Sequence, residues 1–211
     1  MSEMSEIEKA KQGLLYNPLV PELLVERKKM KKLCWEYNHL CPDDVERRDA
    51  LIHQILPNTE GTFPFPYVEP TFFCDFGYNI HCGDRLICNH NVVILDTARV
   101  DIGHDCMIAP GVQISTATHP LDAETRVAGL EYALPVSIGN RVWIGMGSQI
   151  LPGVSIGHDC VIGAGSVVTK DIPDRCVAAG VPCRVIRHLD DTEIETRREE
   201  AAATRVAVTA E

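Results

Sequence analysis

Long apolar runs are missing from this sequence of 211 residues, and its first residues are acidic and polar. A membrane-spanning helix needs about 18 or more consecutive apolar residues, and a secretion signal needs a charged segment followed by an apolar one. Neither pattern occurs. We therefore expect a protein that does not enter a membrane and that resides in the cytoplasm.

Basic residues are in deficit, with 20 Lys and Arg against 30 Asp and Glu and a formal net charge of −10. Nucleic acids and anionic membrane surfaces attract proteins with a net positive surface. The charge balance argues against both as the main partner.

Paired cysteine motifs are absent, although the chain has nine cysteines. The odd number and the lack of any Cys-x-x-Cys pair favour neither a closed disulfide framework nor a zinc ribbon. We expect reduced thiols, several of them inside the repeat described next, where a small apolar side chain suits a packed interior.

Aromatic residues are scarce, at 6% of the chain against 45% apolar residues, so Val, Ile, Leu and Ala must fill the core. From about residue 80 these residues recur with a period of six. Each unit has one aliphatic residue and, four places later, a second small or β-branched one. The aliphatic positions are Ile102, Ile108, Ile138, Ile144, Ile150, Ile156, Ile162 and Val168, and the second positions are Cys106, Val112, Val142, Ser148, Val154, Cys160 and Ser166.

A strict period of six fits neither a continuous helix nor a continuous strand, which repeat at 3.6 and 2 residues. It fits a coil in which every hexapeptide forms one short strand and a turn, with its aliphatic residue pointing inward. The sequence therefore predicts a mainly β protein built as a parallel β-helix. The handedness of the coil does not follow from the spacing.

The regions outside the repeat predict a helical cap and a tail. Apolar residues with helical spacing occur in three stretches separated by Pro18, Pro21, Pro42 and Pro57. We expect a helical cap over residues 1–60, a linker over 62–70 within a β-helix domain of 61–189, and a flexible acidic tail over 190–211. The expected helical faces are Ile7, Ala10 and Leu14; Leu23, Met30, Leu33 and Tyr37; and Val45, Ile52, Ile55 and Leu56.

The repeat is interrupted between Ile114 and Ile138, and the inserted segment contains His119 followed by Pro120. An insertion in a solenoid leaves the stack as a loop, and such loops commonly carry function. Imidazole titrates near neutral pH, so one ring nitrogen can accept a hydroxyl proton if the other is held by a carbonyl or carboxylate. Taken alone, a loop histidine followed by proline is more often structural or merely solvated, and that alternative stays open at this point. His104 and His158 share one place in the repeat and are expected to be turn residues.

Seven segments of the chain resemble those of the maltose and galactoside O-acetyltransferases, in order and over about residues 5–189. The first coils are closer to the maltose type. Departures occur at Tyr16-Asn17-Pro18, where relatives often carry an aspartate for the sugar, and at Ile87 and Thr97. The matching segments are Trp35–His39, Val68–Phe72, Asp75–Asn79, Thr116–Pro120, Val142–Gly145, Val168–Ile172 and Ala179–Arg184.

The resemblance implies a left-handed parallel β-helix, a homotrimer with active sites between subunits, and direct transfer of acetyl from acetyl-coenzyme A to a hydroxyl of a sugar such as maltose, glucose or a galactoside. It implies that His119 is the general base, that Glu131 orients it, and that Asn89 stabilises developing negative charge and contacts the acceptor. Asp75 and Asp96 are implied to hold acceptor hydroxyls. No metal is required.

The donor end falls on later coils. Small residues there would let the pantetheine arm lie against the backbone, and basic residues would supply charge for its phosphates. The positions that match the family's coenzyme A groove are Trp143, Gly145, Ala164, Thr169, Lys170, Arg184 and Arg187.

Two other functions remain open for such a coil. A zinc enzyme of the carbonic anhydrase type would need three imidazoles from adjacent coils, for which His81, His104 and His119 are the candidates. A scaffold without catalysis would need only the solenoid itself.

Overall fold

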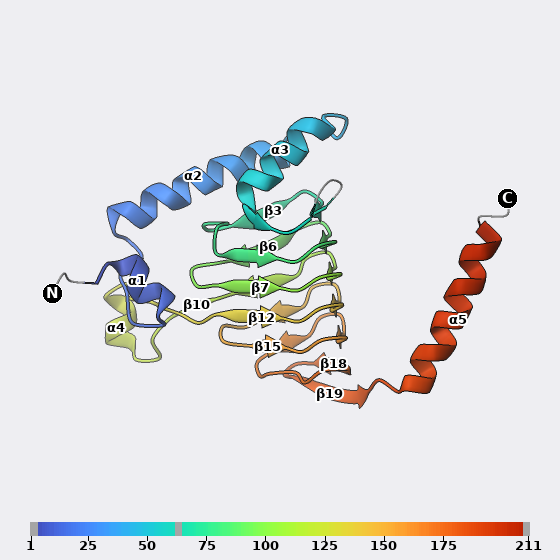
Figure 1. Cartoon of the computed structure of the whole chain (residues 1–211). Coiled ribbons are helices and arrows are strands. Elements are labelled where there is room, and N and C mark those ends of the chain that lie inside the picture. The colour runs from blue at the N-terminus through green and yellow to red at the C-terminus, as the bar shows by residue number, and fades with distance from the viewer. Residues whose placement is uncertain (1–3, 62–64, 209–211) are drawn as a thin grey trace.

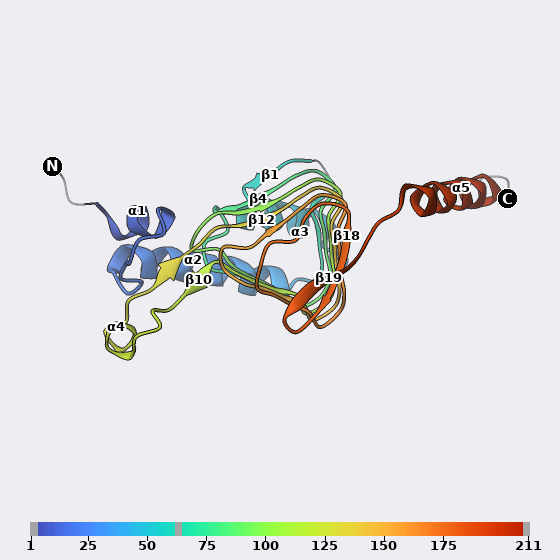
Figure 2. The same ribbon diagram turned by 90° about the horizontal axis from the view of Figure 1, so that it is seen from below.

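The main body of the protein is a parallel β-solenoid, seen in a computed structural model that describes residues 4–61 and 65–208 (Figure 1). Short strands from successive coils stack into three sheets that form the sides of a prism (Figure 2). None of the helices in the described part of the chain is both long and apolar enough to cross a membrane.

Every coil contributes to the three sheets in turn, and the strands within a sheet pair in parallel except at the last pair, β18 and β19. Sheet I consists of β1 (Asn58–Thr59), β4 (Ile80–Cys82), β7 (Val100–Ile102), β12 (Val136–Ile138) and β15 (Ser155–Ile156). Sheet II consists of β2 (Tyr67–Val68), β5 (Ile87–Cys88), β8 (Met107–Ile108), β13 (Trp143–Ile144), β16 (Val161–Ile162), β18 (Cys176–Gly180) and β19 (Cys183–His188). Sheet III consists of β3 (Phe72–Cys74), β6 (Val92–Leu95), β9 (Gln113–Ser115), β14 (Gln149–Ile150) and β17 (Val167–Val168).

The predicted repeat positions fill the interior of this prism. The aliphatic positions pair in register between coils, as Ile108, Ile144 and Ile162 do in sheet II. All eight are at most 3% exposed, and the second positions are buried as well. Burying one such aliphatic side chain is worth roughly 1.5–3 kcal/mol, and the repeat collects this gain at every coil. The predicted coil is confirmed, and all nine cysteines are free, as expected.

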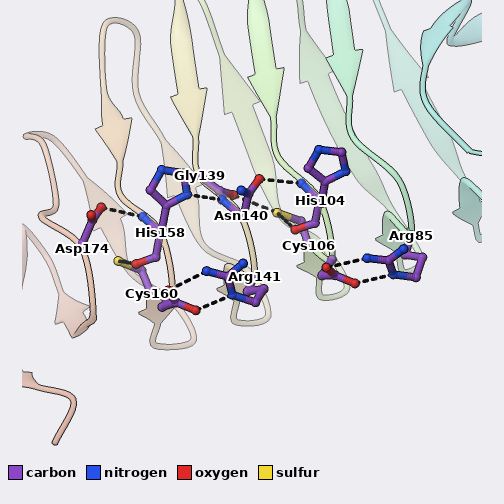
Figure 3. A network of polar contacts seen from close by, with 11 residues as sticks. Arg85, His104, Cys106, Gly139, Asn140, Arg141, His158, Cys160 and Asp174 are labelled. Carbon is purple, nitrogen blue, oxygen red and sulfur yellow. Dashed lines mark hydrogen bonds and ion pairs between the residues drawn. The ribbon is translucent and has the colours of Figure 1, made fainter. Parts of the chain in front are cut away.

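Neighbouring coils are also joined by a column of hydrogen bonds at one corner of the prism (Figure 3). The Nδ1 atom of His104 accepts the backbone N–H of Asp84 at 3.0 Å, and Nδ1 of His158 accepts that of Asn140 at 2.9 Å. Between them, Oδ1 of Asn140 accepts the backbone N–H of His104 at 2.9 Å. His104 and His158 are therefore turn residues that link coils, as predicted.

A second column at this corner alternates arginine and aspartate, and all of its members have left-handed φ angles of 56° to 59°. Arg141 contacts Asp159 through Nε at 2.6 Å and Nη2 at 2.8 Å. Water and salt screen such exposed pairs, so the column adds regularity to the stack more than stability. Its members are Arg85, Asp105, Arg141, Asp159 and Arg175.

The helical cap lies across the first coils (Figure 1) and consists of α1 (Glu6–Lys11), α2 (Pro21–Asn38) and α3 (Val45–Ile55). The Tyr37 hydroxyl donates to the carbonyl of Val68, which ties α2 to the first coil. Helices in this region were predicted, but the prediction is wrong for Leu14, which lies beyond the end of α1 and is exposed. Val45 is helical, as expected, and begins α3 with an exposed side chain.

The ends of the solenoid differ slightly from the expected boundaries. Strand β1 already pairs with β4, so the coil begins at Asn58, three residues before the predicted start. Within the expected linker, β2 is formed, while residues 62–64 lie outside the described residues. In the expected tail, α5 (Asp191–Val208) stands away from the coil (Figure 1), and residues 209–211 lie outside the described residues.

Candidate active site

The interruption of the repeat forms a β-hairpin that projects from the prism (Figure 2). Strands β10 (Ala117–Thr118) and β11 (Tyr132–Ala133) pair antiparallel, and the short helix α4 (Ala123–Val127) lies between them. The hairpin leaves the coil after β9, at the corner between sheets III and I. Thr116 anchors its base, because its buried hydroxyl donates to the carbonyl of Leu95 at 2.8 Å.

His119 follows β10, and 58% of its side chain is accessible. Its Nε2 atom lies 3.9 Å from Oε1 of Glu131, which comes directly before β11. This is an ion-pair distance and is too long for a hydrogen bond. The two residues predicted to act together are therefore neighbours across the hairpin.

Glu131 is itself held by a residue from the amino-terminal segment. The Tyr16 hydroxyl donates to Oε2 of Glu131 at 2.6 Å, and the backbones of the two residues form an isolated antiparallel bridge. The sequence marked Tyr16 only as part of a departure from the family pattern. No local signal could have paired two residues that are 115 positions apart.

A second, smaller core fixes Tyr16, which is 2% exposed. It joins the amino-terminal segment, α2, the coil corner and the hairpin, and it is separate from the core inside the coil. Burial raises the pKa of the Tyr16 phenol, and the neighbouring Glu131 raises that pKa further, so the hydroxyl stays protonated as a donor. The buried members of this core are Ala10, Tyr16, Leu23, Phe76, Ala98 and Ala133.

Asp75 lies close to this group, directly after β3, and is half-buried. Burial raises the pKa of its carboxyl, Arg27 and Lys31 act in the opposite direction, and Glu131 adds to the rise. The electrostatic influence of Glu131 on Asp75 places both carboxylates in one region. We call Tyr16, Asp75, His119 and Glu131 the hairpin cluster.

Asp96, predicted to hold acceptor hydroxyls, does not fit that role in this structure because it has no exposed surface. Its Oδ1 atom accepts the backbone N–H groups of Asp75 at 3.0 Å and Phe76 at 2.9 Å. Its Oδ2 atom is buried without a hydrogen-bond partner among the described residues. Of the two aspartates, only Asp75 reaches the surface, and Asp96 holds its backbone.

The burial of Asp96 predicts a pH-dependent stability. Burial raises the pKa of its carboxyl to about 7, and neighbouring Asp75 contributes to the rise, while the backbone N–H of Phe76 opposes it. A carboxyl with a raised pKa in the folded state binds more protons there than in the unfolded chain, so it costs stability increasingly as the pH rises from about 4 to 7.

An Asp96→Asn variant cannot titrate at this position and escapes that cost. Its free energy of unfolding relative to the wild type should rise by roughly 2–3 kcal/mol between pH 5 and pH 8. Urea unfolding at the two pH values measures this difference. If variant and wild type differ in their free energy of unfolding by the same amount at pH 5 and pH 8, Asp96 keeps an ordinary pKa.

Asn89, predicted to contact the reacting groups, and two of the residues predicted for the donor side lie at another corner of the prism, between sheets II and III. Asn89 follows β5, Gly145 follows β13 and Ala164 lies between β16 and β17. A Cβ atom at Gly145 would lie 2.6 Å from the backbone nitrogen of Ala164, so the stacking of the coils by itself requires glycine there. We call Asn89, Gly145 and Ala164 the corner column.

The other residues predicted to bind the donor lie on sheet II or directly after the last strand of sheet III. Trp143 begins β13 beside the corner column and is 53% exposed. Thr169 and Lys170 follow β17, at the corner from which the hairpin leaves, and both are exposed. Arg184 and Arg187 lie on β19, the terminal antiparallel strand, and are exposed as well.

One chain therefore does not bring all the predicted residues together. The hairpin projects on the side of the prism opposite β18 and β19 (Figure 2), while the corner column lies where sheet II meets sheet III. The chain offers an imidazole with a carboxylate at one corner and the amide side chain of Asn89 beside Gly145 and Ala164 at another.

The three histidines weighed as zinc ligands are not brought together either. His81 lies on β4 in sheet I, His104 is engaged in the turn column and His119 projects on the hairpin. Among the residues that the structure describes, no three His, Cys, Asp or Glu side chains are grouped as a metal-binding set.

Comparison with known protein families identifies both parts of the chain. Residues 9–61 match the model of the maltose acetyltransferase hexapeptide capping motif, and residues 135–170 match that of the bacterial transferase hexapeptide with six repeats. The galactoside O-acetyltransferase of Escherichia coli is 43% identical over 190 residues, which cover 90% of this chain and 92% of that protein.

Solved structures agree with this result. A maltose O-acetyltransferase from Clostridium difficile has a TM-score of 0.86 and 44% identity, covering 90% of this chain and 100% of that one. A galactoside acetyltransferase in complex with coenzyme A has the same TM-score and 42% identity, covering 90% of this chain and 94% of that one.

Proposed function

Since this chain belongs to the maltose and galactoside O-acetyltransferase family of hexapeptide-repeat proteins, we propose that it transfers the acetyl group of acetyl-coenzyme A to a hydroxyl of a sugar. The observation that carries the proposal is the exposed His119 imidazole, 3.9 Å from the Glu131 carboxylate, on the single large excursion from the described coils. Maltose, glucose and galactosides are the acceptors that the family and the sequence favour.

The proposed reaction is a direct attack without a covalent enzyme intermediate. Glu131 faces one ring nitrogen of His119, and the other nitrogen takes the proton of the acceptor hydroxyl as its oxygen bonds to the acetyl carbonyl carbon. The carbonyl oxygen becomes negative, and the side-chain amide of Asn89 is the donor available to stabilise it. When the intermediate collapses, the carbon–sulfur bond breaks and the imidazolium returns the proton to the coenzyme A thiolate.

Asp75 is the group we assign to the acceptor sugar. Its half-buried carboxylate lies in the same region as Glu131 and beside the cations Arg27 and Lys31. A carboxylate accepts two hydroxyl hydrogen bonds at once, which suits neighbouring hydroxyls of a pyranose. Asn89 would contact the same substrate from the other side.

Trp143, Gly145 and Ala164 are the residues we assign to the pantetheine arm, and Lys170, Arg184 and Arg187 to the phosphates of coenzyme A. The exposed indole of Trp143, two residues before Gly145, supports this assignment because it offers an apolar surface to the arm. Exposed Thr169 would contact the donor next to Lys170.

A homotrimer with active sites between subunits would unite the two corners. The hairpin cluster of one protomer would meet the corner column of its neighbour. The outer face of sheet II supports an assembly, since a row of exposed and partly exposed apolar side chains runs along it, and such rows mark interaction surfaces. This row, which we call the apolar stripe, consists of Tyr67, Ile87, Met107, Trp143, Val161 and Val177. The free thiols and the use of acetyl-coenzyme A fit a cytoplasmic enzyme.

The test is to incubate the protein with acetyl-coenzyme A and a panel of maltose, glucose and galactosides, following the release of the coenzyme A thiol. The rate of colour development with protein alone is subtracted, because Cys41 is an exposed thiol that also reacts with the thiol-detecting reagent. We expect sugar-dependent thiol release together with an acetylated sugar detected by mass spectrometry. A folded protein that acetylates none of these sugars would overturn the proposed acceptor class.

A further inference from the structure

A chain of three polar groups leads from the capping region to His119. The Tyr16 hydroxyl donates to Oε2 of Glu131 at 2.6 Å, and Oε1 of Glu131 lies 3.9 Å from Nε2 of His119. Exposure rises along this chain, from 2% for Tyr16 through 19% for the Glu131 side chain to 58% for that of His119. A buried anchor thus holds a carboxylate that faces an accessible imidazole.

The anchor is rigid because its backbone and its ring are both fixed. The N–H groups of Tyr16 and Glu131 each donate to the carbonyl of the other residue at 3.0 Å. The Tyr16 ring belongs to the second core, with Leu23 and Phe76 among its members. A glutamate side chain has three rotatable bonds, so a donor on one of its oxygens removes much of the freedom that would otherwise turn it away from the imidazole.

A purely structural role for Tyr16 would not need its hydroxyl. The backbone bridge and the packing of the ring hold the hairpin against the cap whether or not the phenol oxygen is present. The oxygen instead meets the one carboxylate that faces His119, and the raised pKa of Tyr16 keeps it a donor. The hydroxyl therefore acts on the orientation of Glu131.

We infer that Tyr16 is a positioning residue for acetyl transfer: it fixes the Glu131 carboxylate against His119 and makes the amino-terminal segment before α2 part of the active site. The inference rests on the proposed function. It also explains how a capping segment, remote in sequence from the hairpin, contributes to catalysis.

The first test is a Tyr16→Phe variant, which keeps the ring and the backbone bridge. We expect kcat to fall about tenfold, the size typical for one lost hydrogen bond to a charged group, with the KM for acetyl-coenzyme A unchanged. In a Glu131→Gln background the same substitution should have little further effect, because the carboxylate that it positions is gone. A wild-type kcat, or an equal loss in both backgrounds, would overturn the inference.

Tyr37→Phe is the matched control. Tyr37 is also a buried cap tyrosine at 2% exposure, but its hydroxyl donates to the carbonyl of Val68 on the first coil, away from the hairpin. It should lower the unfolding midpoint about as much as Tyr16→Phe does and leave kcat unchanged. If both variants lose activity equally, the effect is one of cap stability and the positioning role is wrong.

A readout without turnover separates this inference from the proposed function. Long-range ¹H–¹⁵N spectra, assigned with His119→Ala, report which ring nitrogen of His119 carries the proton. We expect Tyr16→Phe and Glu131→Gln to change that tautomer ratio in the same direction, and Tyr37→Phe to leave it alone. An unchanged ratio in Tyr16→Phe refutes the positioning role, whether or not the wild type acetylates a sugar.

Discussion

Replacing His119 with alanine is expected to lower kcat by about 10²–10⁴-fold, the range typical of losing a general base. No other imidazole among the described residues faces Glu131 on the hairpin, so nothing nearby can take the hydroxyl proton in its place. The fold should be unaffected because the side chain is 58% exposed and belongs to neither hydrophobic core. Steady-state kinetics with the best sugar, beside a thermal unfolding curve, measures both effects.

His53→Ala is the control for this prediction. His53 is a partly exposed histidine on α3 whose Nε2 atom lies 3.5 Å from Asp49 within the same helix. It should keep wild-type kinetics. A His119→Ala variant that turns over at the wild-type rate would show that His119 is not the general base. The family assignment would be unaffected, because it rests on sequence and structural similarity.

Replacing Met107 with lysine is expected to dissociate the proposed trimer and, with it, to abolish most of the activity. Met107 is 53% exposed on β8, in the middle of the apolar stripe, between Ile87 on β5 and Trp143 on β13. An ammonium group buried there without a partner costs several kcal/mol. Since the hairpin cluster and the corner column lie at different corners, a separated protomer would retain only half of each active site.

Ser137→Lys provides the matched control on the opposite kind of surface. Ser137 lies on β12, where the outer row of sheet I is polar and Asp101 is its direct neighbour on β7. The new lysine there meets a carboxylate and water, so mass and activity should stay as in the wild type. Light scattering and sedimentation give the mass. Met107→Lys that keeps both the wild-type mass and its activity would show that the apolar stripe is not the interface.

The hexapeptide pattern predicted the coil because each position of the repeat has the same environment in every coil. The aliphatic position that Ile144 occupies, for example, recurs every six residues, and the side chains at this position point into the interior. The interruption likewise predicted the excursion that carries His119, since extra residues cannot enter a stack of fixed rise. Residue roles at His119 and Glu131 came from the resemblance, and so did the hand of the coil.

Local sequence patterns could not predict which polar residues are buried. Asp75 and Asp96 have similar surroundings in the sequence, yet one reaches the surface and the other accepts two backbone N–H groups inside the coil. The need for glycine at Gly145 likewise comes from the stack, because a Cβ atom there would collide with the next coil. Both outcomes depend on which coil lies above, which the spacing within one repeat does not record.

By itself, the sequence determined the parallel coil, its inward residues, the helical cap and the place of the hairpin. These features follow from the six-residue repeat, its interruption and the prolines, which are patterns among neighbouring residues. Only the tertiary structure decided that Tyr16 meets Glu131 across 115 positions, and that the hairpin and the corner column occupy separate corners of one chain. The reason is physical: hydrophobic periodicity specifies which way a side chain points, whereas contacts between distant segments depend on how whole coils, cap and hairpin pack.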